Sequence, residues 1–261
     1  MTDTEFITTT FAGSVATISL CRPERHNAFN DEMVSQFTAA LSALHRNSDV
    51  RAVVLRGEGK SFSSGRDTAV LGTRARGESD IEFVARAQDN IRLISSMPVP
   101  VIAALKGWVL GGSFEKALHC DVRIAGDDAK MGLPEVGHGL IPDTGGVSRL
   151  RALAGPGLTK DLVLTGRQLT AAEALAAGVV SRVVPTAELD AAAADIAARI
   201  ADQPPLAVRL ARQVINDLDN DDHERALRQE VLAQAACFAS EDRRELKASK
   251  AEGRAPVFRG R

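Results

Sequence analysis

The sequence predicts an α/β fold followed by a region made of helices alone. Short apolar runs such as "RAVVLRG" and "PVPVIAALKG" have the continuous apolar centre of strands that are covered on both faces. Between these runs lie segments whose apolar residues recur every three or four positions, as in amphipathic helices. From about Thr186 onward, only helical patterns remain. Strands that alternate with helices need crossover connections, which are right-handed in almost all proteins.

The N-terminal part begins with a predicted hairpin. The stretch "FITTTFAGSVATISLC" contains two β-rich runs separated by Ala12 and Gly13. The polar stretch "RPERHNAFN" then predicts a loop. A helix is predicted over 31–45, because five apolar residues have helical spacing there: Met33, Val34, Phe37, Leu41 and Leu44.

The middle of the chain continues the alternation of strands and helices. The strand "RAVVLRG" is followed by a predicted helix over 81–95, and the strand "PVPVIAALKG" by a helix from Gly112 to His119. The strand "DVRIAG" precedes a loop and two further helices, one from about Thr144 and one over 158–164.

Clear boundary signals mark the helices of the last third. Thr170 and Glu173 have the spacing of a capping box, and Gly178 stands where that helix should end. Four more helices are predicted over 191–200, 206–218, 223–238 and 243–252. We therefore divide the chain into a core over 1–190 and a helical region over 191–261.

Composition excludes several classes of protein. With 261 residues, 44% hydrophobic and 25% charged residues and a net charge of −2, the chain is typical of one soluble globular core rather than a nucleic-acid-binding surface. Neither a secretory leader nor an apolar run of about 20 residues is present, so we expect no membrane partner and a cytoplasmic location. Three distant cysteines, Cys21, Cys120 and Cys237, predict buried thiols rather than disulfides, and we expect no metal site.

Two glycine-containing turns are the first candidates for chemistry. Gly111 and Gly112 end a predicted strand and open a helix, whose first amide groups are unpaired and partly positive. No GK[ST] follows, which excludes a Walker-type phosphate loop, and tight strand-to-helix packing is the alternative explanation of this pair. The second turn lies in "GKSFSSGRDT". If the two turns converge, one amide from each can stabilise a developing oxyanion.

Four motifs follow one another along the chain: "FSSGRD", "KGWVLGGSFEKALHCDVRIA", "LPEVGHGLIPDTGGVSRL" and "PVFRGR". Together they resemble the crotonase superfamily of enoyl-CoA hydratases and isomerases. The resemblance implies a crotonase-like (ClpP/crotonase) spiral of ββα units over 1–190, which carries an acyl-CoA site. It also implies that the helical region over 191–261 forms homotrimers, commonly paired into homohexamers. The implied partner is an acyl-CoA thioester substrate, with no separate cofactor because coenzyme A is part of the substrate.

The resemblance also assigns residues. It implies an oxyanion hole made by the backbone N–H groups of Arg66 and Gly112. The two glutamates of the hydratases match Glu115, which would activate the attacking water, and Glu135, which would deliver the α-proton. Considered alone, Glu115 would complement the dipole of its helix and Glu135 would be a solvated loop carboxylate.

Several departures from the hydratase pattern leave the reaction open. Asp143 stands where many hydratases carry glycine and where some isomerases of the superfamily carry a catalytic aspartate, but it is also a good N-cap. Phe114 and Trp108 are bulky residues that would narrow the acyl pocket if they point inward, or else pack in the core. The side chain of Arg66 is expected to point to a CoA phosphate or to solvent. A double-bond isomerase and a non-catalytic acyl-CoA-binding relative remain alternatives to a hydratase.

By the same resemblance, the loop "RPERHNAFN" and neighbouring residues bind the CoA part. The expected contacts are Arg25, His26, Ala28 and Lys60, together with the turn residues Ser64, Gly65, Asp67 and Gly111. His26 does not indicate a serine hydrolase, because the sequence has no G-x-S-x-G motif.

Overall fold

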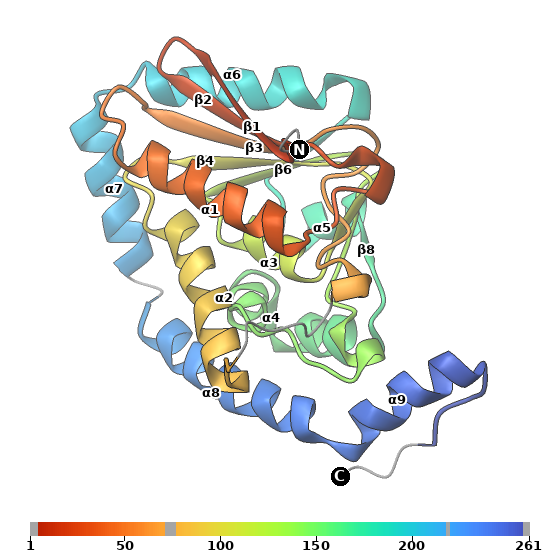
Figure 1. Ribbon diagram of the computed structural model, residues 1–261. Helices are drawn as coiled ribbons and strands as arrows, with labels where there is room; N and C mark the ends of the chain where they lie inside the picture. The colour runs from red at the N-terminus through yellow and green to blue at the C-terminus, as the bar shows by residue number, and fades with distance from the viewer. Residues whose placement is uncertain (1–4, 71–76, 218–219, 258–261) are drawn as a thin grey trace.

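The computed structural model describes residues 5–70, 77–217 and 220–257. Its main sheet has six strands in the order β1-β2-β3-β4-β6-β9 (Figure 1). The predicted hairpin forms from β1 (Ile7–Ala12) and β2 (Val15–Leu20), which pair antiparallel. All later neighbours pair in parallel: β3 (Ala52–Gly57), β4 (Val101–Leu105), β6 (Val122–Gly126) and β9 (Arg182–Val184). The α/β fold is therefore confirmed.

The sheet separates two hydrophobic clusters, as the apolar runs of β3 and β4 predict. Val53 and Leu55 face one cluster with α1 (Asp31–His45), whereas Ala52 and Val54 face the other with α6 (Leu189–Ala201). Successive residues of a strand point to opposite faces, so a strand buried on both faces is apolar throughout. The predicted helix over 31–45 has the bounds of α1, and Asn30 caps it by accepting a hydrogen bond from the Met33 amide at 2.8 Å.

A second, small sheet was not predicted. It consists of β5 (Trp108–Leu110), β7 (Lys130–Gly132) and β8 (Leu169–Thr170), in the order β5-β7-β8. Such short strands have too few residues to show a period of two. They matter for the site because β5 leads directly into α3 (Gly112–Leu118).

Most predicted helices form with bounds shifted by a few residues. Ser79 and Glu82 make a capping box at the start of α2 (Asp80–Ser95), and Thr170 and Glu173 make the predicted one at α5 (Ala171–Ala176). The helices predicted from Thr144 and over 158–164 are one element, α4 (Gly146–Thr165), which is interrupted at Gly155 with φ +75°. Within the described ranges, the loops contain four short 3-10 helices: η1 (Pro23–Arg25), η2 (Thr68–Val70), η3 (Glu135–His138) and η4 (Thr186–Glu188).

The C-terminal helices are α7 (Pro205–Asp217), α8 (Asn220–Ala239) and α9 (Glu241–Glu252). In Figure 1, α8 runs below α2 and α4, against which it packs, and α9 extends beyond the body of the molecule. The predicted boundary at residue 190 falls inside α6, which packs on β3, β4 and β6 rather than with α7 to α9. The assembly role of 191–261 stays a prediction.

Three further expectations concern the described residues only. None of their helices combines the length and the apolar character that crossing a membrane requires. No cluster of three or more His, Cys, Asp or Glu side chains within 5–70, 77–217 and 220–257 is placed to hold a metal ion. The three cysteines are unpaired, but only Cys120 is buried, whereas Cys21 and Cys237 are half-buried. The expectation of three buried thiols was therefore wrong for two of them.

Candidate active site

Two turns that are distant in the sequence lie side by side. The amide of Ser63 donates to the Trp108 carbonyl at 2.9 Å, and the amide of Leu110 donates to the Ser63 carbonyl at 3.1 Å. The hydroxyl groups of Ser63 and Ser113 are hydrogen bonded at 2.7 Å. The segment that follows β3 thus runs along β5, which brings the first glycine turn against the second.

Two glycines allow this close approach. Gly65 has φ +96°, and a Cβ atom there would lie 2.8 Å from the Leu110 carbonyl oxygen. Gly111 has φ +55°, and its Cβ atom would lie 2.9 Å from Oε1 of Glu135. Any other residue would be strained at both positions and would push the turns or the carboxylate away.

Arg66 and Gly112, whose amide groups are the predicted oxyanion hole, line a common cavity. Phe29 donates its amide to the Gly65 carbonyl at 2.8 Å and accepts from the Asp67 amide at 2.9 Å. Because neighbouring amides of an extended chain alternate in direction, the Arg66 N–H points away from Phe29. Gly112 is the first residue of α3, where amides have no partner within the helix. No backbone acceptor in the described ranges takes either amide, and both residues line the cavity.

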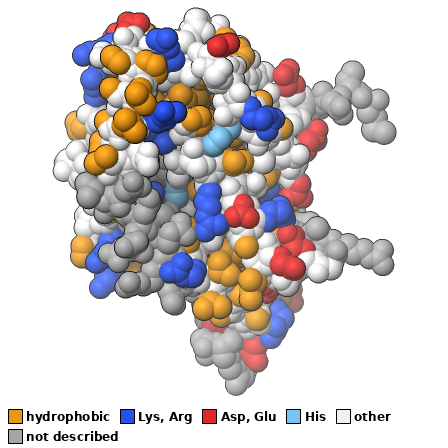
Figure 2. Space-filling model, turned by 90° about the vertical axis from the view of Figure 1, so that its left-hand side faces the viewer, with side chains coloured by type: hydrophobic (Ala, Val, Ile, Leu, Met, Phe, Trp, Pro, Cys, Tyr) orange, Lys and Arg blue, Asp and Glu red, His pale blue; other side chains and the backbone are white. Residues whose placement is uncertain are grey.

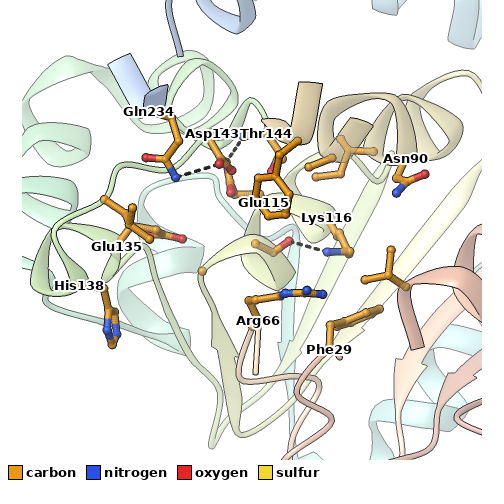
Figure 3. A pocket seen from close by; sticks show the side chains of 18 of the residues that line it. Phe29, Arg66, Asn90, Glu115, Lys116, Glu135, His138, Asp143, Thr144 and Gln234 are labelled. Carbon is orange, nitrogen blue, oxygen red and sulfur yellow. Dashed lines mark hydrogen bonds between the residues drawn. The ribbon is translucent and has the colours of Figure 1, made fainter. Parts of the chain in front are cut away.

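Glu115 is almost fully buried on α3, with 1% of its surface exposed. Its Oε1 atom accepts hydrogen bonds from the amides of Thr144 at 3.0 Å and Gly146 at 2.8 Å. Figure 3 shows Glu115 close to Thr144. Burial raises the pKa of Glu115, whereas these hydrogen bonds act in the opposite direction. One carboxylate oxygen is therefore fixed by the turn before α4, and the other is left for the cavity.

Glu135 lies in η3 and lines the same cavity. Its Oε2 atom is buried without a hydrogen-bond partner among the described residues, so this is not the solvated loop carboxylate of the alternative interpretation. Burial, and then the neighbouring charge of Glu115, raise the pKa of Glu135 well above its usual value. A carboxyl group in this environment tends to keep its proton at neutral pH.

Asp143 also lines the cavity, and it does not cap a helix. Its Oδ2 atom accepts a hydrogen bond from Nε2 of Gln234 at 2.9 Å. The N-cap of α4 is Gly145, which has no side chain to bond the helix, so the capping alternative for Asp143 is wrong. Burial, followed by the charge of Glu115, raises the pKa of Asp143 to about 7.

Three residues around these acids were not predicted. Gln234 and Glu230 come from α8, and Glu230 accepts a hydrogen bond from the Gly145 amide at 2.8 Å. Burial raises the pKa of Glu230 to about 9. Lys116 follows Glu115 and lines the cavity. Only Lys116 had a signal in the sequence, because it is an ionisable residue inside a predicted apolar helix.

The predicted binding residues divide into two groups. Those that line the cavity are Ser64, Gly65, Arg66, Gly111 and Gly112, together with the three acids. Those outside it are Arg25, His26, Ala28, Lys60, Asp67, Trp108 and Phe114. The loop of His26 nevertheless adjoins the first turn, because the Ser64 amide donates to the His26 carbonyl at 2.9 Å.

Phe114 and Trp108 do not line the cavity, so the interpretation that they narrow the acyl pocket was wrong. Phe114 is fully buried in the main hydrophobic cluster, where it packs with the core. Trp108 is 46% exposed and stacks on His26, with ring centroids 5.4 Å apart. The side chain of Arg66 forms an ion pair with Asp31, which is exposed. A contact between Arg66 and a CoA phosphate stays a prediction.

Two more predicted contacts have structural partners. Asp67 accepts a hydrogen bond from Arg22 at 2.7 Å, which lowers the pKa of Asp67. The same guanidinium donates to the Ala28 carbonyl at 2.9 Å, so Arg22 joins the loop to the first turn. Arg25 and Lys60 are exposed.

Comparisons with known proteins all point to one family. The sequence model described as "Enoyl-CoA hydratase/isomerase" matches residues 10–261. The chain is 39% identical over 232 residues to "Crotonyl-CoA hydratase" of Syntrophomonas wolfei, covering 88% of this chain and 89% of the relative. It is 37% identical to "Short-chain-enoyl-CoA hydratase" of Clostridium acetobutylicum, covering 89% of each.

Solved structures give the same result. The enoyl-CoA hydratase/isomerase of Pseudoalteromonas atlantica superposes with a TM-score of 0.87 at 28% identity, covering 98% of this chain and 100% of that one. The enoyl-CoA hydratase of Bacillus anthracis superposes with a TM-score of 0.78 at 33% identity and the same coverage of 98% and 100%.

Proposed function

Because the chain belongs to the enoyl-CoA hydratase/isomerase family, we propose that it adds water across the 2,3 double bond of a 2-enoyl-CoA thioester. The observation that carries this proposal is that two unpaired amides and two buried carboxyl groups line one cavity. These are the amides of Arg66 and Gly112 and the side chains of Glu115 and Glu135. The relatives named for crotonyl-CoA and short-chain enoyl-CoA hydration support the same reaction.

The two amides bind the thioester oxygen in this proposal. When hydroxide adds at the β-carbon, electron density moves through the double bond to that oxygen and gives an enolate. Amide donors fixed in a water-poor cavity stabilise the enolate more than the ground-state carbonyl, and loss of one such donor typically costs about 10²- to 10³-fold in rate. Arg66 and Gly112 are fixed because their turns are tied together through Ser63 and Leu110.

The two glutamates divide the proton transfers. Glu115 accepts a proton from the attacking water, whose oxygen bonds to the β-carbon, because its Oε1 is held by two amides and its Oε2 is left for the cavity. Glu135 gives a proton to the α-carbon, for which a raised pKa is suited. The product is the 3-hydroxyacyl-CoA, so the elements of one water molecule are added overall. No further cofactor takes part in this proposal.

A double-bond isomerase is the second candidate function. Asp143 supports it, because its carboxyl group lines the cavity and has a pKa of about 7. A group that titrates near neutrality can take a proton from one carbon and return it to another. A non-catalytic acyl-CoA binder is less well supported, because binding alone does not require three acids in the cavity, one buried and two half-buried.

The proposed assembly is a homotrimer or a pair of homotrimers. The face on the left of Figure 1 is bordered by α7 and is shown in Figure 2, where hydrophobic side chains gather in several groups. On α7, four large apolar residues are exposed: Leu206, Leu210, Val214 and Ile215. An exposed apolar helix face of this kind is typical of a subunit contact.

A hydration assay tests the proposed function directly. Purified protein mixed with crotonyl-CoA should remove the absorbance of the conjugated enoyl thioester and form 3-hydroxybutyryl-CoA. In D₂O, the product should carry one deuterium at the α-carbon. A shifted double bond without added water would favour the isomerase, and unchanged crotonyl-CoA and longer 2-enoyl-CoAs would contradict hydration.

A further inference from the structure

Lys116 places a cation inside the proposed acyl cavity, where the hydration mechanism has no use for one. Its ammonium group donates to the Gly112 carbonyl at 3.2 Å and lies 4.5 Å from the centre of the Phe29 ring. No carboxylate of the described residues forms an ion pair with it. An ammonium group has three N–H donors, so hydrogen-bonding capacity remains for a ligand.

Burial makes the charged form of Lys116 less favourable than it is in water. Burial lowers the pKa of Lys116 to about 8; the charges of Glu115 and Asp143 partly oppose this shift, and the neighbouring Arg66 adds to it. The ammonium is therefore still the main form at neutral pH, without the solvent that normally stabilises it. A bound anion would offset this cost, because charge-assisted hydrogen bonds are stronger in a site shielded from water.

The position of the ammonium limits where such an anion can be. A Cβ atom placed on Gly112 would lie 3.9 Å from Nζ of Lys116 and 4.0 Å from Oε2 of Glu115. The lysine and the proposed base thus both lie about 4 Å from the position that a Cβ atom of Gly112 would occupy. A substituent within a few bonds of the reacting carbons would come within reach of Nζ.

Glu135 and Lys116 lie on opposite sides of Glu115. In Figure 3, Lys116 and Phe29 lie on one side of Glu115, and Glu135 and His138 lie on the other. The raised pKa values of Glu115, Glu135 and Asp143 also mean that these groups carry less than three negative charges near neutral pH. Repulsion of an anionic substituent beside Lys116 is correspondingly reduced.

We propose that Lys116 binds a carboxylate on the acyl chain, so that the preferred substrate is a short 2-enoyl-CoA with a second, free carboxyl group. This inference rests on the proposed function for the reaction but concerns the substrate class. Glutaconyl-CoA is the matched probe, because it differs from crotonyl-CoA only by a carboxylate on the carbon next to the β-carbon. Lys116 is a specificity residue in this proposal and takes no part in the proton transfers.

Binding of saturated analogues tests the proposal without catalysis. Isothermal titration calorimetry with glutaryl-CoA and butyryl-CoA should show that the protein binds glutaryl-CoA more tightly, by about tenfold or more. Lys116→Met has a side chain of similar length without charge, and it should abolish this preference. The control Lys160→Met removes a charge from an exposed position of α4 that does not line the cavity, and it should keep the preference.

Turnover gives the second readout. The ratio of kcat/KM for glutaconyl-CoA to kcat/KM for crotonyl-CoA should fall by about tenfold or more in Lys116→Met, with a circular dichroism spectrum like that of the unsubstituted protein. Equal binding of the two saturated analogues, or an equal loss for both in Lys116→Met, would overturn the proposal. If neither enoyl-CoA is hydrated, the proposed function fails, and the calorimetric comparison still decides the role of Lys116.

Discussion

Glu115 and Glu135 are held differently, although both carboxyl groups line one cavity. Two backbone amides fix Oε1 of Glu115, whereas Oε2 of Glu135 has no partner in the described part of the chain. A fixed carboxylate is suited to orient water, and an unpaired buried carboxyl group is suited to carry a proton. The two environments therefore support different roles for chemically identical side chains.

Replacing either glutamate should stop most of the hydration. Glu115→Gln and Glu135→Gln should each lower kcat for crotonyl-CoA by about 10²- to 10⁴-fold, because an amide neither accepts nor supplies the required proton. The decrease in enoyl absorbance measures the rate. The control Glu188→Gln, at an exposed position in η4, should keep the rate. A loss below about tenfold in both site variants would contradict the two-glutamate mechanism.

Asp143 distinguishes the two candidate reactions. In a hydratase, Asp143→Asn should lower kcat for crotonyl-CoA by less than about tenfold, since asparagine keeps an oxygen that accepts the hydrogen bond from Gln234. Product analysis by mass spectrometry, with a 3-enoyl-CoA as second substrate, measures both activities. Loss of double-bond migration in this variant, with little hydration in the unsubstituted protein, would instead identify the isomerase.

Glu230 should make stability depend on pH. Its pKa is raised from 4.5 to about 9 by burial, so the folded state holds a proton that the unfolded state releases between these values. The stabilising contribution of Glu230 to the free energy of unfolding is fully present below about pH 4.5. It is lost as the pH rises toward about 9, by at most about 1.4 kcal/mol per pH unit. Melting temperatures of Glu230→Gln should therefore fall less over this range than those of the unsubstituted protein. Parallel curves for the two proteins would contradict this expectation.

At the scale of elements, the glycine turns determine where the two amides point. The turn after β3 and the turn before α3 are tied by the hydrogen bonds of Ser63 with Trp108 and Leu110. α4 contributes as well, because the amides at its start hold Glu115. The site is thus formed by the ends of strands and the starts of helices. A change of backbone conformation there should alter the reaction rate as well as the stability of the fold.

Gly65→Ala should show this coupling. The substitution places a Cβ atom 2.8 Å from the Leu110 carbonyl oxygen at φ +96°, which should destabilise the protein by about 1–3 kcal/mol. Displacement of the Arg66 amide should also lower kcat by about 10²-fold or more. Urea unfolding and the hydration assay measure the two effects. Gly157→Ala is the matched control, because its Cβ atom would meet nothing within 4 Å and its φ is not positive.

At the scale of the whole molecule, α7 presents an apolar face that the single chain does not cover. Leu210 and Val214 are 49% and 62% exposed and lie four residues apart on this helix. Residues with this spacing share one face of a helix. A second copy of the chain would remove this face from water.

An acidic residue on this face should therefore weaken the assembly. Leu210→Asp should shift the mass measured by sedimentation from that of a trimer or hexamer toward that of a single chain, because a carboxylate is costly to bury in an apolar contact. Leu164→Asp is the control, since Leu164 is 71% exposed at the end of α4. A single-chain mass for the unsubstituted protein would contradict the proposed trimer.

The sequence by itself determined the features that depend on neighbouring residues. Helix α1 has the predicted bounds, and Thr170 and Glu173 form the predicted capping box, because spacing and capping act within a few residues. The four motifs together, in their order along the chain, predicted the family that the comparisons show. The short strands of the second sheet were missed, because too few residues carry their pattern.

Only the tertiary structure decided which of these groups meet. In the folded chain, Asp143 does not cap α4, and its side chain accepts a hydrogen bond from Gln234 of α8. Phe114 and Trp108 lie outside the cavity. Lys116 lines the same cavity as Glu115. The physical reason is that crossover connections place distant segments side by side, so burial, charge and hydrogen-bond partners at the site come from residues that no local pattern relates.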